Sequence, residues 1–402
     1  MGFGPMMSSL LRNKTGPLLV ALQIAVTLAI VINSLFIIMQ RVEKMNRPTG
    51  IDVDNVIVTY VRGFGEDFDV VSSITNDIDL IKSISGVVAA TVSNHVPLSG
   101  SGSGTGLRAV ADETITPIGV GRFRWSEEGL DAMGIELSRG RNFYPQEVNY
   151  ILPTSENGTP PSVLITQDLA ESLFGEEDAL GKPVYWGDME ASTVVGIIGH
   201  MHGSWVTWDK LTNVVIQPGK PAYTTNKYII RVEPGMRDEL LPVIEQKLGE
   251  SNRQRVIKRV STLEDLAARS YQQDRGTAII LSIVISLLIG LTVLVIVGLS
   301  SFHVTQRTKQ IGTRRALGAR RIDIIKQFML ENWLVTTAGA LLGALLTFAL
   351  AYWLEVSFEL PRLDWRFLPA GIVTLWVMSS LAAFEPARRA ASVPPAVATR
   401  SV

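Results

Sequence analysis

The stretch GTAIILSIVISLLIGLTVLVIVGLSSF, at residues 276–302, holds 27 consecutive residues without a charge. A helix rises about 1.5 Å per residue, so a stretch of this length crosses a hydrocarbon core roughly 30 Å thick. The stretch therefore predicts a transmembrane helix. Three further charge-free blocks, at residues 17–40, 332–354 and 367–384, predict three more spans.

The composition of the whole chain agrees with a membrane protein. Of its 402 residues, 47% are hydrophobic and 19% are charged, which is more apolar than an ordinary soluble protein of this length. No cysteine is present, which excludes disulfides, thiolate zinc sites, iron–sulfur clusters and cysteine nucleophiles. The formal net charge of −1 conceals a strong division of charge between regions.

Lysine and arginine in the short segments predict how the spans are oriented. Residues 1–16, 303–331 and 385–402 together carry twelve basic side chains and three acidic ones. The link at residues 355–366 has two arginines and three acids, as expected on the opposite face. The positive-inside rule then places both termini in the cytoplasm.

Residues 41–275, between the first and second spans, are numerous enough to bury a core of their own. They carry 23 basic and 32 acidic side chains. β-Branched runs alternate with amphipathic stretches, which predicts an extracytoplasmic α+β domain beside the four-span helical bundle. Glycine-, serine- and proline-rich stretches at residues 98–106 and 153–161 are expected to divide it into two subdomains. The expected strands are 56–60, 86–92, 162–165, 192–198, 227–232 and 255–260, and the expected helices are 77–85, 168–174 and 237–248.

No residue pattern predicts catalysis, a cofactor or a metal. The segment at residues 175–182 has five residues between its glycines where a phosphate loop has four, and Pro183 follows where Ser or Thr would hold magnesium. His200 and His202 could share a metal, but a solvated strand end is the favoured interpretation. The four spans contain no Asp, Glu, Lys, Arg or His, which disfavours a self-powered carrier.

The cytoplasmic segment QRTKQIGTRRALGARRIDIIKQFML, at residues 306–330, is the most informative one. From Arg321 onward, apolar residues at helical spacing predict an amphipathic helix that leads into the third span. A basic cluster beside a span binds anionic lipid headgroups, and we expect that contribution here. Small apolar residues interleave with the arginines, as at Ile311 and Gly312, which favours docking into a groove of a cytoplasmic partner.

This segment resembles the MacB/FtsX-like permeases of ABC transporters. The family signature runs approximately Arg-x-x-Glu-Ile-Gly-x-Arg-Arg-Ala-Leu-Gly-Ala, and this chain matches it in register from Arg307 to Ala319 except at Gln310. Residues 386–400 resemble the closing motif of the family, and residues 129–143 and 173–182 resemble its periplasmic core. The resemblance implies that the ATPase-coupling residues are Arg307, Gln310, Ile311, Gly312, Arg314, Arg315, Ala316, Leu317, Gly318 and Ala319.

The resemblance implies an export permease of the bacterial inner membrane that binds no cofactor itself. A separate cytoplasmic ABC ATPase would use ATP and magnesium, and its closing would be passed through residues 303–331 to the periplasmic domain, a process called mechanotransmission. Members act as dimers, so a second copy or a paralogue is implied, with a periplasmic adaptor and an outer-membrane duct. Membrane lipids are further expected partners, and nucleic acid is not. The expelled substrate would be a drug, a peptide or a lipid-like molecule.

Two other functions stay open at this point. The same transmission of motion could serve a non-transporting transmembrane signal relay that controls a periplasmic hydrolase or sensor. It could also serve a lipoprotein-release permease. A groove between paired domains would favour export, a partner-binding patch would favour a relay, and a hydrophobic cleft facing the bilayer would favour lipoprotein release.

Gln310 departs from the family pattern, because the family has an acid there. A charged contact with the ATPase is therefore expected to be weaker, as in one half of a heterodimer. Residues 1–16 and 385–402 are too short for a nucleotide-binding domain, so the ATPase is expected on another polypeptide. Residues 261–275 are expected to continue the second span as a rigid stalk.

Gly339 and Gly343 are a candidate helix-packing pair in the third span. Glycines four residues apart lie on one face of a helix and let a second backbone approach closely. In a span rich in alanine and glycine, chance explains such a pair equally well, so the sequence leaves both interpretations open.

Overall fold

The computed structural model describes residues 15–153, 158–187, 189–392 and 394. The chain divides into two compact units. The membrane unit comprises the described residues of 1–46 and 274–402, and the inserted unit comprises those of 47–273. The chain therefore leaves the membrane unit after the first long helix and returns to it at the second.

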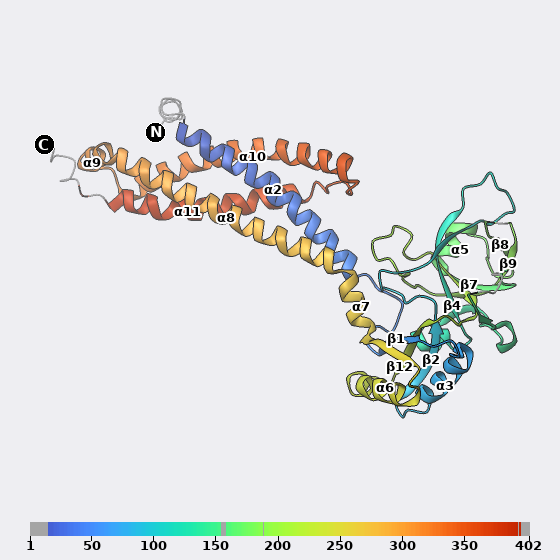
Figure 1. Cartoon of the computed structure of the whole chain (residues 1–402). Helices are drawn as coiled ribbons and strands as arrows, with labels where there is room; N and C mark the ends of the chain where they lie inside the picture. Colours follow the sequence, from blue (N-terminus) through green and yellow to red (C-terminus); the bar gives the residue numbers. More distant parts are fainter. Residues whose placement is uncertain (1–14, 154–157, 188, 393, 395–402) are drawn as a thin grey trace. The chain divides into compact units, whose positions relative to one another are not determined.

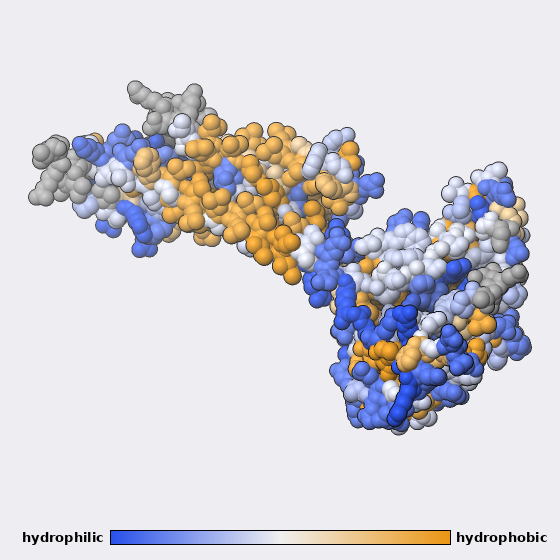
Figure 2. Space-filling view, viewed as in Figure 1, coloured by the Kyte–Doolittle hydropathy of each residue, from blue (hydrophilic) through white to orange (hydrophobic). Residues whose placement is uncertain are grey.

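Four long helices make up most of the membrane unit (Figure 1). They are α2 (Thr15–Met45), α8 (Gln272–Gln306), α10 (Arg321–Phe358) and α11 (Phe367–Ser392). All four are long and apolar enough to cross a membrane, and hydrophobic residues dominate their surface in Figure 2. A short helix, α9 (Thr308–Ala316), lies between α8 and α10. The prediction of four spans is confirmed.

The four long helices are not packed equally. Helix α2 forms the centre of a tight group with α10 and α11, where Leu28 and Ile32 of α2 pack against Ala340 and Leu375. In contrast, the buried residues of α8 are Asp274, Thr292 and Ile296. Most of the apolar surface of α8 is thus free of contacts with this chain.

The inserted unit contains a four-stranded antiparallel sheet in the order β13-β1-β12-β2. Its strands are β1 (Val56–Gly63), β2 (Val87–Ser93), β12 (Thr225–Val232) and β13 (Arg255–Thr262). Helices α3 (Val70–Lys82) and α6 (Arg237–Ser251) pack against this sheet through Ile74, Ile81 and Ile244. Both ends of the unit's sequence contribute to this sheet, so the segment between β2 and β12 is an insertion in it.

That segment forms a seven-stranded mixed sheet in the order β3-β4-β10-β7-β9-β5, with β8 paired to β9. The helices α4 (Gly129–Met133) and α5 (Gln167–Phe174) belong to the same segment, as do the short η1 (Pro145–Glu147) and the pair of β6 (Tyr150–Ile151) and β11 (Lys220–Pro221). The strands are β3 (Gly104–Leu107), β4 (Ile118–Trp125), β5 (Leu137–Gly140), β7 (Ser162–Thr166), β8 (Pro183–Tyr185), β9 (Ala191–Ile198) and β10 (Val214–Pro218).

One hydrophobic core joins the two sheets. Val56 and Ile229 of the first sheet pack with Phe123, Trp125 and Leu164 of the second. Successive side chains of a strand point to opposite faces of the sheet. The face of each sheet that points away from the shared core therefore packs into a separate hydrophobic core. The α+β class is confirmed, and the two subdomains share apolar packing.

The structure corrects several expected boundaries. The helix expected at 77–85 is α3, which begins at Val70 because Asp69 caps it by accepting a hydrogen bond from the backbone N–H of Ser72 at 3.1 Å. Only residues 98–103 of the stretch at 98–106 lie between the two sheets in the sequence, because residues 104–106 belong to β3. The stretch at 153–161 lies within the segment that forms the second sheet, and residues 154–157 are outside the described part. Strands β4 and β10 were not predicted.

The expected stalk at residues 261–275 is not one helix. Residues 261 and 262 end β13, α7 (Leu263–Ser270) follows, and Tyr271 separates it from α8. The side chain of Thr262 accepts a hydrogen bond from the backbone N–H of Asp265 at 3.0 Å, which starts α7. A rigid continuation of α8 over that whole range is therefore wrong.

A buried ion pair joins helix α3 to β13. The side chains of Asp77 and Arg255 are 3% and 1% exposed and form an ion pair, and the Tyr228 hydroxyl donates to Asp77 at 2.8 Å. Burial, and then the adjacent Asp77 charge, raise the pKa of Tyr228 well above its usual value, so its hydroxyl stays protonated as a donor.

We expect Asp77→Asn to destabilise the chain by about 3 kcal/mol, because it leaves the Arg255 charge buried without its partner. Thermal unfolding of the full chain in detergent, followed by circular dichroism, measures the change. The matched control is Glu177→Gln, which removes an exposed carboxylate paired with Lys182 and should leave the melting temperature nearly unchanged. Equal losses in the two variants would contradict a special role for the buried pair.

Candidate coupling site

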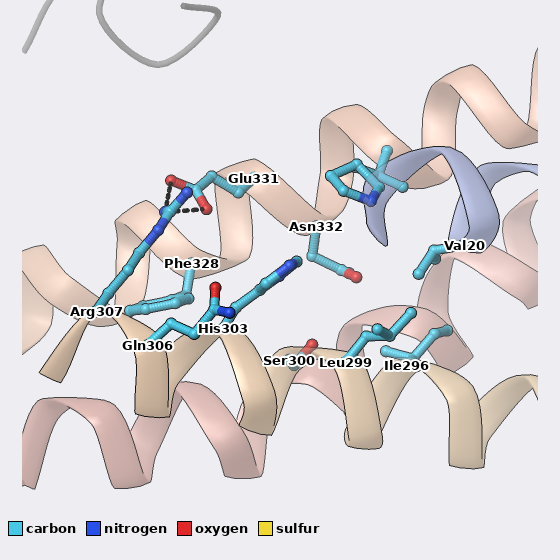
Figure 3. Close-up of a pocket in the computed structure, with 12 residues that line it drawn as sticks. Val20, Ile296, Leu299, Ser300, His303, Gln306, Arg307, Phe328, Glu331 and Asn332 are labelled. Atoms are coloured by element: carbon cyan, nitrogen blue, oxygen red, sulfur yellow. Dashed lines mark hydrogen bonds and ion pairs between the residues drawn. The ribbon is translucent and has the colours of Figure 1, made fainter. Parts of the chain in front are cut away.

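The segment that links α8 to α10 is anchored by an ion pair. Arg307 ends α8 in a non-helical conformation, with φ −101° and ψ 10°, and α9 begins directly after it. Its Nη1 donates to both carboxylate oxygens of Glu331 on α10, each at 2.9 Å (Figure 3). Glu331 also accepts from Gln327 at 3.3 Å. Arg307, the first residue of the coupling signature, thus fixes the segment internally.

The inward face of α9 is apolar. Ile311 and Gly312 are the buried residues of this helix. Ile311 packs against Ile324 of α10 and against Ala390 and Ala391 of α11. These contacts hold α9 against the ends of both helices, so the Ile-Gly pair of the signature has a packing role inside the chain.

The opposite face of α9 is exposed. Leu317, at its end, is 83% exposed, which is the highest value among the exposed large hydrophobic residues. Arg314 is exposed and its Nη1 donates to Gln327 at 2.6 Å. Gln310, Ala316 and Gly318 are exposed as well, and Arg315 and Ala319 are half-buried.

Gly318 determines where this segment turns. Its φ of 98° is in the left-handed region, which favours glycine. The backbone N–H groups of Gly318 and Ala319 donate to the carbonyls of Arg315 and Arg314, each at 3.1 Å, and so end α9. Asp323 then accepts from the backbone N–H of Arg320 at 3.1 Å and starts α10. Leu317 is thereby presented at the tip of a tight helix–turn–helix.

A small cavity of about 70 Å³ lies beside the ion pair. In Figure 3, His303 and Gln306 of α8 lie beside Phe328 and Asn332 of α10, and Val20 of α2 is at the far end. A Cβ added at Gly16 would lie 3.0 Å from His303 Nε2, so the beginning of α2 passes closely over α8 here. This end of the bundle therefore brings three helices together around polar side chains.

The other end of α8 is held by charges. Asp274, with a side chain 2% exposed, forms an ion pair with Arg41 of α2 and lies 3.4 Å from the ammonium of Lys44. Midway along α8, the hydroxyls of Thr292 and Thr27 lie 2.9 Å apart. Our sequence reasoning missed these contacts, although Arg41 and Asp274 stand directly beside the apolar blocks.

Gly339 and Gly343 face α2 within the same chain. A Cβ at Gly339 would lie 2.8 Å from the carbonyl oxygen of Ala21, and one at Gly343 would lie 2.9 Å from Leu28 Cδ2 and 3.0 Å from Ala25 Cα. Real Cβ atoms essentially never come as close to a backbone atom as at Gly339, so this position requires a residue without a Cβ. At Gly343 a Cβ would fit only if Leu28 and the backbone of α2 shifted slightly.

Two family models match the sequence. The model for the MacB-like periplasmic core domain matches residues 18–242, and the model for the C-terminal part of FtsX-like permeases matches residues 282–395. Together they account for the inserted unit, the spans and the coupling segment. The chain belongs to the MacB/FtsX-like permease family. The resemblance inferred from the coupling signature is confirmed.

Relatives of this permease include proteins named macrolide export ATP-binding/permease protein MacB. The one from Agrobacterium fabrum is 30% identical over 70% of this chain and 42% of its own length, and the one from Chromobacterium violaceum is 25% identical over 71% and 43%. The permease thus spans less than half the length of the curated relatives it matches. Among solved structures, the periplasmic region of MacB from Actinobacillus actinomycetemcomitans aligns with 55% of this chain and 94% of its own, at 13% identity and a TM-score of 0.32.

Replacing Gly343 with leucine is expected to disrupt the contact between α2 and α10, because the new side chain would overlap Leu28 and Ala25. The purified variant should lose at least several degrees of thermal stability in detergent. The matched control is Gly290→Leu in α8, where nothing lies within 4 Å of an added Cβ. If both variants melt at the same temperature as the parent chain, the close approach of α2 to α10 is not required for stability.

Proposed function

We propose that this permease transmits the ATP-driven motion of a cytoplasmic ABC ATPase to its periplasmic domain and so expels a substrate from the cell. The observation that carries the proposal is the connection of α9 to α8. Helix α8 has 35 residues, begins where the inserted unit ends, and leads directly to α9. A movement of α9 is therefore passed along one uninterrupted helix, without an intervening loop.

The contacts of α8 favour this role. It buries few residues against the other helices but has ion pairs at both ends, through Asp274 and through the adjoining Arg307. A helix with little apolar packing in its own chain can shift at low cost, and specific polar contacts restrict it to a few positions. Two such positions would correspond to two states of the ATPase.

The outward face of α9 is the proposed docking surface for the ATPase. Leu317 offers an exposed apolar anchor, and Arg314 and Gln310 lie on the same exposed side of the segment. An apolar anchor surrounded by charged side chains is typical of the centre and rim of a protein interface. With Gln310 in place of an acid, binding would depend on Leu317 and Arg314 more than on a carboxylate.

The remaining partners follow from the same proposal. A second copy or a paralogue would cover part of the exposed apolar face of α8, which includes Ile280, Leu287 and Leu294 at seven-residue spacing. The basic segments would face the cytoplasm at the inner membrane, and anionic lipids would contact them. A periplasmic adaptor and an outer-membrane duct would complete the export path for a drug, a peptide or a lipid-like molecule.

A double substitution of the outward face, Arg314→Glu with Leu317→Ser, should weaken association with the ATPase by roughly tenfold or more while the chain still inserts. Co-purification and ATPase turnover in liposomes measure the effect. The control is Arg388→Glu, a charge reversal at an exposed cytoplasmic position of α11. Equal losses in both would indicate general attraction to lipid and would contradict a docking role.

Asp274→Asn should separate docking from transmission. Asparagine has the same shape but cannot neutralise Arg41 and Lys44, so the contact between α2 and α8 should weaken by about 3 kcal/mol. We expect ATPase binding to persist while ATP hydrolysis and export become uncoupled. Asp265→Asn, at an exposed position of α7, is the control. Full coupling in the Asp274 variant would show that this ion pair is not part of the transmission path.

A further inference from the structure

A cluster of basic side chains lies in the inserted unit where β2 ends, next to β4 and β12. We define the basic cluster as His95, Arg122, Arg124 and Lys227. Arg122 and Arg124 are two residues apart on β4, so both point to the same face of the strand. The alternate residues Phe123 and Trp125 point to the other face, into the core that joins the two sheets.

The basic cluster is held in place by neutral groups. Arg124 is 9% exposed, and it donates from Nε to Gln217 at 3.3 Å and from Nη1 to the Tyr223 hydroxyl at 3.0 Å. Arg122 donates from Nη2 to the Ser103 hydroxyl at 3.0 Å, and Lys227 donates to the carbonyl of Asn94. These acceptors orient the cations without neutralising their charge.

The positive charges of the cluster disfavour protonation of His95. The Lys227 ammonium is 3.5 Å from His95 Nδ1. Burial, and then the charges of Lys227 and Arg122, lower the pKa of His95 to about 4. Burial and the adjacent Arg124 also lower the pKa of Arg122. At neutral pH the cluster therefore carries three positive charges beside a neutral histidine.

Elsewhere in the same unit, the buried Arg255 and the more exposed Arg141 both have carboxylate partners. Arg255 pairs with Asp77, and Arg141 pairs with Glu147 at 2.7 Å. In the part of the chain that the structure describes, neither Arg122, Arg124 nor Lys227 lies within 4.0 Å of a carboxylate oxygen. In addition, Nε of Arg122 is buried and has no hydrogen-bond partner there.

Acids are not scarce in this region, because residues 41–275 carry 32 of them. Buried or half-buried charges without a carboxylate partner cost free energy, and natural proteins keep such arrangements mainly at functional sites. We propose that the basic cluster is an anion site that binds a phosphate group, through Arg122, Arg124 and Lys227.

Phosphate fits these donors better than a carboxylate does. Its oxygens accept several hydrogen bonds from different directions, and guanidinium groups form strong charge-assisted bonds to them. The donors come from β4 and β12, two strands of different sheets, and the glycine- and serine-rich stretch at 98–106 contributes Ser103. The phosphate could belong to a lipid headgroup or to a soluble molecule, and the chemistry of recognition is the same.

Equilibrium dialysis of the full chain in detergent against radiolabelled inorganic phosphate, at constant ionic strength in chloride, tests the proposal. We expect saturable binding of one phosphate per chain. Arg122→Gln and Lys227→Gln should each weaken it about tenfold or more, because each removes a charged donor. The control Lys258→Gln removes the same charge from an exposed position of β13 and should bind as the parent does.

Thermal unfolding without phosphate shows whether the variants fold. Removing one of several repelling charges should leave the melting temperature of Arg122→Gln unchanged or higher. The cations would be structural if the melting temperature of Arg122→Gln fell strongly while Lys227→Gln bound phosphate as the parent chain does. That result would overturn the proposal. Absence of saturable binding, or equal binding by Arg122→Gln and Lys258→Gln, would overturn it too.

Competition identifies the source of the phosphate. Glycerophosphoglycerol is the soluble headgroup of an anionic lipid. If it competes more strongly than unlabelled phosphate does, the bound phosphate belongs to a lipid. If it competes less strongly, the bound phosphate belongs to a soluble phosphorylated molecule. Equal competition by acetate would overturn the preference for phosphate. This inference does not depend on coupling to an ATPase, so either proposal can fail without the other.

Discussion

The attachment of α8 to the rest of the bundle by polar contacts is the constraint on which the proposed mechanism depends. In hydrocarbon, an apolar side chain gains little by exchanging lipid for another helix, so apolar surface alone does not fix where a helix lies. Asp274 with Arg41 and Lys44 at one end, the Thr27–Thr292 contact in the middle, and Arg307 with Glu331 at the other end define the position of α8. These contacts are directional, and they can be broken and remade when α8 moves.

The other three long helices behave as a frame. Helix α10 approaches α2 so closely that Gly339 leaves no room for a Cβ and Gly343 leaves very little, and α11 contributes Leu375 to the same core. Close packing over this length resists deformation. The membrane unit thus combines a closely packed group of three helices with a fourth that has few apolar contacts, as the proposed transmission of motion requires. Helix α9 lies on that frame through Ile311 and Ala390 and is joined to α8 at Arg307.

The inserted unit has a different balance of forces. Its two sheets share one apolar core, which includes Ile229 of the first sheet and Leu164 of the second, so a load applied to one subdomain is passed to the other through this core. The basic cluster lies where residues from both sheets meet, with Arg124 on β4 and Lys227 on β12. An anion bound there would cross-link the two sheets and would favour whichever relative position keeps its donors together.

The sequence by itself determined the four spans, the inserted α+β domain and the family, because charge-free length and a contiguous signature are local properties of the chain. Six of the strands were predicted from the sequence. It missed β4 and β10, whose glycines, arginines or short length hide the alternation, and also the short strands β3, β5, β6, β8 and β11. It also joined residues 261–275 into one stalk across the break at Tyr271. The coupling residues were named as one set, yet only the tertiary structure separated the inward Arg307 and Ile311 from the outward Arg314 and Leu317. The partner of an arginine, such as Glu331 for Arg307, is a residue far away in the chain, and only folding brings the two together.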